Sequence, residues 1–121
     1  MEQLFYKSLK DFLKDLILSF PEDEELKIIT SGLNIAIIDD SDNKMINTFY
    51  SSLNQFESFI FNRDPLFFKT NTTYFKSGTH QFKFFTKLNE LQVDLSENNK
   101  TKVWDYIRLI YNISSNLHTL S

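Results

Sequence analysis

The sequence predicts an all-α fold, an irregular bundle of about five helices that forms a single domain over residues 1–121. Three long segments place apolar residues at the three- and four-residue steps of an amphipathic helix. The chain contains only two glycines and two prolines, so it offers few breaks between such segments. A domain of this length can bury a core without disulfides, and the chain has no cysteine. We therefore expect the helices to pack their apolar faces against one another.

The first of these segments covers residues 4–20 and should form the first helix. Its apolar residues are Leu4, Phe5, Leu9, Phe12, Leu13, Leu16, Ile17 and Phe20. Pro21 stops the helix because proline disfavours helical geometry in the residue before it. Pro21 can also open a second helix, whose first turn then holds the acids of residues 22–25 at the positive end of the helix dipole. Gly32 is expected to end this second helix.

Residues 33–38 form a short apolar run, and periodicity does not distinguish a buried strand from a helix here. A lone strand would have no partner elsewhere in the chain, so we expect helix or irregular structure. Residues 39–42 then form a polar break with several suitable N-caps. They do not match a calcium-binding loop, because the sixth position counted from Asp40 is Met45 rather than glycine.

The second long helix is predicted over residues 45–61, where apolar residues again recur at helical spacing. They are Met45, Ile46, Phe49, Tyr50, Leu53, Phe56, Ile60 and Phe61. This helix should end at Asn62-Arg63, because Asp64-Pro65 pairs a capping acid with a proline suited to the start of the next helix. We expect that next helix to be short, at 65–69, and a loop around 77–80.

Two further helices complete the predicted bundle. The first is short and carries Phe82, Phe85, Leu88, Leu91 and Leu95 at helical spacing. Ser96 is a suitable start for the last helix, over 98–118, and Trp104 within it is the largest apolar side chain available to the core. The helices at 4–20, 42–61 and 98–118 should form the frame of the fold.

The sequence offers no arrangement of residues typical of catalysis, and we expect a protein that is not an enzyme and has no cofactor or metal. The two histidines, His80 and His118, have no metal-ligating residue at a suitable spacing, so both are expected at the surface. The two glycines cannot build a phosphate-binding loop, and no serine lies in a G-x-S-x-G context.

Charge is distributed unevenly along the chain. Residues 1–62 carry a net charge of −6, residues 63–87 carry +4, and the remainder carries −1. The basic stretch also contains seven of the aromatic residues, and we select from it six candidate interaction residues. They are Phe67, Phe68, Tyr74, Phe75, Lys76 and Lys83.

Three interpretations of residues 63–87 remain open. The aromatic rings can belong to the core, they can form a protein interface, or they can stack on the bases of a single-stranded nucleic acid. The overall acidity of the chain weakens attraction to phosphate. We therefore expect a non-enzymatic interaction or scaffold protein that binds a protein partner or itself, with single-stranded nucleic-acid binding through residues 63–87 as the alternative.

Three segments together resemble a known group of proteins: Phe20-Pro21-Glu22, residues 62–68 (NRDPLFF) and residues 102–111 (KVWDYIRLIY). They are similar to small helical proteins of nucleocytoplasmic large DNA viruses, the giant viruses. The resemblance implies no particular activity, and it implies a location in the infected-cell cytoplasm or the virus particle. Asp105 departs from the pattern, which favours lysine at this position, and this argues against a charge-based role for the last helix.

The sequence also bears on location. The segment Met1-Glu2-Gln3-Leu4 carries an acid instead of a basic leader, and no apolar run approaches the roughly 20 residues that cross a bilayer. The absence of cysteine favours a reducing compartment. We expect a cytoplasmic protein without a membrane partner.

Overall fold

The computed structural model describes residues 2–40, 43–71 and 78–120, and all the regular structure in these ranges is helical. This confirms the predicted helical bundle, with seven α-helices in the described ranges in place of about five. They are α1 (Glu2–Ser19), α2 (Glu24–Ile38), α3 (Lys44–Gln55), α4 (Glu57–Phe61), α5 (Leu66–Asn71), α6 (His80–Leu91) and α7 (Glu97–Leu120), with a 3-10 turn, η1 (Gln92–Asp94), before the last.

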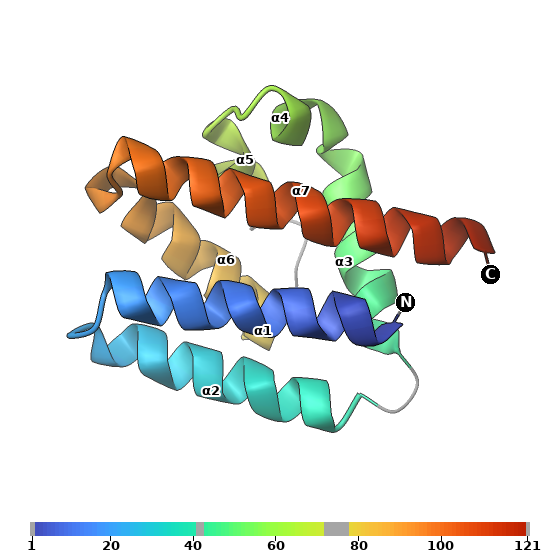
Figure 1. The fold of residues 1–121 in the computed structure, drawn as a ribbon, viewed down its shortest axis with the longest axis horizontal. Coiled ribbons are helices and arrows are strands. Elements are labelled where there is room, and N and C mark those ends of the chain that lie inside the picture. Colours follow the sequence, from blue (N-terminus) through green and yellow to red (C-terminus); the bar gives the residue numbers. More distant parts are fainter. Residues whose placement is uncertain (1, 41–42, 72–77, 121) are drawn as a thin grey trace.

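The helices α1, α2 and α7 set the architecture (Figure 1). The helix α1 lies between the other two and runs antiparallel to both of them. The helix α3 packs against α7, and α6 packs against α2 and α5. The helix α2 therefore lies at the outside of the bundle, with α1 and α6 on its inner side.

Short polar side chains begin several of these helices. The Ser96 hydroxyl accepts a hydrogen bond from the Asn99 N–H at 3.2 Å, which confirms Ser96 as the start of the last helix. We expected the second helix to begin at Pro21, but it begins about one turn later, at Glu24. Asp23 is the N-cap of α2 instead, because its carboxylate accepts a hydrogen bond from the Leu26 N–H at 2.9 Å.

The prediction that Gly32 ends the second helix is wrong. The helix α2 continues through Gly32 to Ile38, so residues 33–38 are helical. A glycine inside a helix costs about 1 kcal/mol relative to alanine, which burial of Leu33 and Ile37 on the inner side of α2 can offset. A Cβ atom at Gly32 would lie 3.0 Å from the imidazole of His80, so glycine also lets α6 approach closely.

The helix predicted at 45–61 is divided at Phe56 into α3 and α4. The Phe56 backbone (φ −115°, ψ 25°) leaves the helical region, and its N–H donates to the carbonyl three residues earlier at 3.0 Å. The Tyr111 hydroxyl of α7 spans this break. It donates to the Glu57 carboxylate and lies 3.0 Å from the side-chain oxygen of Asn54. Contacts with α7 thus hold two helices where the apolar spacing predicts one.

Aromatic rings dominate the core. The fully buried phenylalanines are Phe5, Phe12, Phe49, Phe67, Phe84 and Phe85. Phe12 of α1 meets Phe84 of α6 in an edge-to-face pair with ring centres 5.6 Å apart, a favoured geometry for aromatic rings. Trp104 is buried, as the sequence predicts, and its ring centre lies 5.0 Å from that of Phe68.

Candidate functional site

The structure places the first two candidate interaction residues in the core. Phe67 is 0 % exposed, and its ring meets the rings of Phe85 and Trp104 with centres 6.0 Å from each. Phe68 is buried beside it. Neither side chain is exposed enough to form a binding surface. These two rings therefore belong to the core, and the expectation that they are interaction residues is wrong.

The other candidates lie farther along the basic stretch. Tyr74, Phe75 and Lys76 lie outside the described residues. Lys83 is exposed on α6, while Phe84 next to it is buried. The described part of the stretch therefore does not bring exposed rings and lysines together.

Two basic residues of the stretch are neutralised by acids from elsewhere in the chain. Arg63 lies 3.0 Å from the Asp105 carboxylate of α7. The Lys87 ammonium lies 3.0 Å from Asp23 and 3.1 Å from Glu25, at the start of α2. Burial alone would lower the pKa of Lys87, but hydrogen bonds to these two carboxylates outweigh it and raise this pKa. The net +4 of residues 63–87 thus overstates the charge that a ligand would meet.

An exposed apolar surface that sequence reasoning missed lies on α2. The inner residues of this helix, Leu26, Thr30, Leu33 and Ile37, are buried. Its outer side presents Ile28, Ile35 and Ile38, which are 73 %, 61 % and 76 % exposed. We call these three isoleucines the α2 face. The sequence has apolar residues on both sides of this helix, a pattern typical of a buried helix, so the spacing alone does not identify the exposed side.

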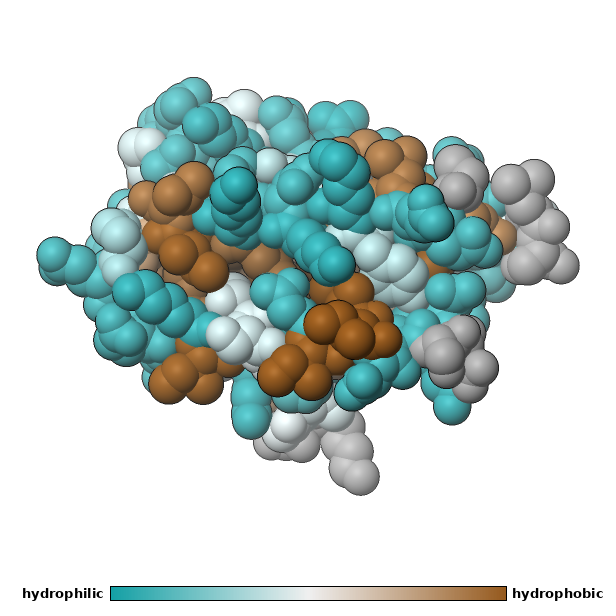
Figure 2. Space-filling model, turned by 60° about the horizontal axis from the view of Figure 1, so that its bottom comes forward, coloured by the Kyte–Doolittle hydropathy of each residue, from teal (hydrophilic) through white to brown (hydrophobic). Residues whose placement is uncertain are grey.

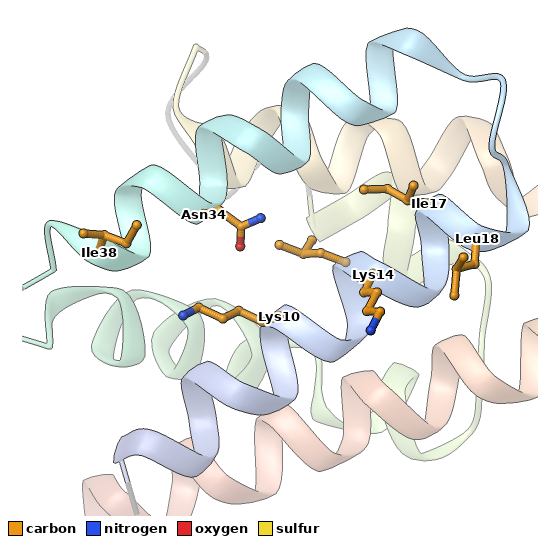
Figure 3. A pocket seen from close by; sticks show the side chains of 7 residues that line it. Lys10, Lys14, Ile17, Leu18, Asn34 and Ile38 are labelled. Carbon is orange, nitrogen blue, oxygen red and sulfur yellow. The ribbon is translucent and has the colours of Figure 1, made fainter.

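A groove between α1 and α2 adjoins the α2 face at Ile38. It has a volume of about 460 Å³ and is lined by Lys10, Leu13, Lys14, Ile17, Leu18, Asn34 and Ile38. Figure 3 shows Lys10 lying beside Ile38 between the two helices. Figure 2, which turns this side of the molecule forward, shows hydrophobic patches separated by hydrophilic side chains. An exposed apolar patch rimmed by polar side chains is typical of an interaction site.

A second, smaller hollow lies between α5, η1 and α7. It has a volume of about 330 Å³ and is lined by Pro65, Phe68, Gln92, Val93, Leu95, Lys100, Val103 and Trp104. Its walls are mainly apolar, and Lys100 at its rim already lies 3.4 Å from Glu97. This hollow is concave, but the residues that line it do not form a set of converging polar groups.

Tyrosine–carboxylate pairs join the helices. The Tyr106 hydroxyl of α7 donates to Asp15 of α1 at 2.5 Å. Burial, followed by this hydrogen bond, raises the pKa of Tyr106 to about 12, so the phenol stays protonated at neutral pH. The Tyr6 hydroxyl of α1 donates to Asp40 in the same way, and burial followed by this bond raises its pKa. These pairs connect α1 to α7 and to the segment that follows α2.

The two histidines are exposed, as predicted, and the His118 ring stacks on Tyr50 with ring centres 4.2 Å apart. Among the residues that the structure describes, no three His, Cys, Asp or Glu side chains gather as ligands for a metal ion. Nor does any helix in those ranges have the length and apolar character needed to traverse a bilayer.

Comparison of the chain with protein-family models, with curated proteins and with solved structures finds no match. The resemblance to giant-virus proteins gains no support from these comparisons. A functional hypothesis therefore has to rest on the surface of the molecule itself.

Proposed function

We propose that this protein is a non-enzymatic interaction or scaffold protein and that its binding surface is the α2 face. One observation carries the proposal: three isoleucines of one helix are each more than three-fifths exposed, although the helix also has a complete buried side. The partner is another protein or a second copy of the chain. The resemblance stated above adds a proposed location, the cytoplasm of an infected cell or the virus particle.

The energetics favour a partner that covers the three isoleucines together. Burial of one of these isoleucines by a partner contributes about 1–2 kcal/mol to the binding free energy, because part of the side chain is already covered in the free protein. Association costs about 4–15 kcal/mol in lost freedom, so no single residue suffices for a stable complex. Loss of one isoleucine should therefore weaken binding strongly.

We expect Ile35→Glu to reduce the capture of the physiological partner by tenfold or more, since tenfold corresponds to about 1.4 kcal/mol. The substitution places a charge at the centre of the α2 face. Because Ile35 is exposed, the fold should be kept, which circular dichroism can verify. The measurement is quantitative affinity capture with the full chain as bait.

Val93→Glu is the matched control, because Val93 is 78 % exposed and lies away from α2, on η1. It should retain the partner that Ile35→Glu loses. Equal capture by the wild type and a folded Ile35→Glu variant would contradict the proposal.

Single-stranded nucleic-acid binding through residues 63–87 is the second candidate. Its support within the described residues is the exposure of Lys69 and Lys83. It predicts that affinity for a labelled oligonucleotide falls steeply with salt and that Lys83→Ala weakens binding. Titration at low salt measures this, and the absence of binding there would remove the alternative.

A further inference from the structure

The hollow between α5, η1 and α7 has fixed apolar walls. Phe68 of α5 and Trp104 of α7 are 3 % and 7 % exposed, and their ring centres lie 5.0 Å apart. Both rings are held by the core, so this side of the hollow exists before any ligand arrives. Pro65, Val93 and Val103 extend its apolar lining. Its volume of about 330 Å³ lies at the small end of the range for small-molecule sites, roughly 300–1,000 Å³.

The polar side chains that line this hollow are already paired. The Gln92 amide nitrogen donates to the Asn89 side-chain oxygen at 2.7 Å. The Lys100 ammonium lies 3.4 Å from the Glu97 carboxylate, which balances its charge. An anionic ligand would have to displace Glu97 from Lys100 before it gained an ion pair. A neutral ligand needs no such exchange, so the lining favours a molecule without charge.

The indole N–H of Trp104 is the exception among the polar groups of the lining. It makes no hydrogen bond to any residue that the structure describes. It is also not fully covered, because the buried side-chain oxygens and nitrogens without a partner in the described ranges comprise the Thr86 hydroxyl alone. The N–H therefore reaches solvent through the small exposed part of a side chain that lines the hollow. A buried indole N–H usually has an acceptor, and here a ligand can supply it.

We propose that this hollow binds a small neutral molecule that is mainly apolar and carries one hydrogen-bond acceptor. The acceptor takes the Trp104 N–H, and the apolar part lies against Phe68 and Val103. If each non-hydrogen atom takes about 30 Å³, the share of a water molecule in the liquid, the hollow holds roughly ten such atoms. An aryl ketone with a single ring has this size and chemistry. The site lies on other elements than the α2 face, so it goes beyond the proposed function and does not depend on it.

The first test uses the single tryptophan of the chain, because an isotope-labelled protein then shows a single indole N–H signal in its NMR spectrum. Acetophenone should move this signal saturably, with a dissociation constant below about 1 mM. Ethylbenzene keeps the ring and lacks the acceptor. It displaces water from the N–H without replacing the hydrogen bond, so it should bind about tenfold more weakly. Phenylacetate carries a charge into the apolar hollow and should also bind more weakly than acetophenone.

The second test closes the hollow from its rim, and it is clean because the chain contains no cysteine. Val93 is 78 % exposed, so Val93→Cys should keep the fold. Reaction of the introduced thiol with a bulky maleimide should weaken acetophenone binding at least tenfold. Ile35→Cys on α2, modified in the same way, is the matched control and should bind acetophenone as the wild type does. Circular dichroism verifies the fold of both modified proteins.

The absence of a saturable shift with acetophenone up to about 1 mM, or equal affinity for acetophenone and ethylbenzene, would overturn the proposal. Tighter binding of phenylacetate would mean that Lys100 exchanges Glu97 for the ligand, and it would overturn the neutral ligand class. Binding that is unaffected by modification at Val93 would reject this hollow as the site. Each of these results leaves the α2 face untouched, because that surface is tested by Ile35→Glu against a protein partner.

Discussion

Phe67→Ala is expected to lower the free energy of unfolding by about 3–5 kcal/mol, a large part of the 5–15 kcal/mol that stabilises a typical domain. The Phe67 ring is fully buried and touches the rings of Phe56, Phe68, Phe85 and Trp104. Its removal takes away apolar burial and leaves a cavity that surrounding helices fill only partly. Urea unfolding followed by circular dichroism measures the change.

Phe61→Ala provides a control of the same chemistry at the surface. Phe61 is 45 % exposed, and its contacts are with Tyr111 and the guanidinium of Arg108. This substitution should cost less than half as much as Phe67→Ala. If both variants lost the same stability, or if Phe67→Ala unfolded like the wild type, Phe67 would not hold the place in the core that the structure gives it.

Helix spacing made much of this fold predictable. The steps between Leu9, Phe12, Leu13 and Leu16 identify one side of a helix, and all four side chains are buried. The prediction for Trp104 succeeded for the same reason, since its neighbours at helical spacing share its side of α7. The local pattern locates a helix because burying one apolar side of it stabilises the fold.

The errors arose where contacts with distant residues override the local signal. Gly32 has the character of a helix end, yet packing against His80 and burial of Leu33 carry α2 past it. The apolar spacing runs unbroken across Phe56, yet Tyr111 of α7 holds both sides of a break there. Such contacts depend on the final arrangement of the helices, which periodicity does not contain.

The candidate site was harder to predict than the fold. An aromatic residue in a basic stretch can face the core or a partner, and sequence does not say which, as Phe67 shows. The charges of Arg63 and Lys87 look available in sequence but are paired with acids far away along the chain. By contrast, the isoleucines of α2 look like core residues, and only the position of α2 at the outside of the bundle exposes them.

Lys87→Met is expected to lower the free energy of unfolding by about 1–3 kcal/mol, because it leaves the partly buried carboxylate of Asp23 without its partner. The Lys87 side chain is only 10 % exposed and connects α6 to Asp23 and Glu25 at the start of α2. Methionine retains the apolar stem and removes the ammonium group. Lys83→Met, at an exposed position of the same helix, should change stability by less than about 0.5 kcal/mol.

The pH dependence of the stability difference between the wild type and Lys87→Met identifies the origin of that difference. The hydrogen bond from the Leu26 N–H, and next the one from Lys87, lower the pKa of Asp23 from its usual 3.8. A lowered pKa gives stability that is present above pH 3.8 and is lost as pH falls through the folded-state value. The raised pKa of Lys87 gives stability that is present below pH 10.5 and is lost only above it. The difference between wild type and Lys87→Met should therefore be constant near neutral pH and should shrink below about pH 4. A difference that persists undiminished in acid would mean that the Lys87 ammonium group does not stabilise the fold through these carboxylates.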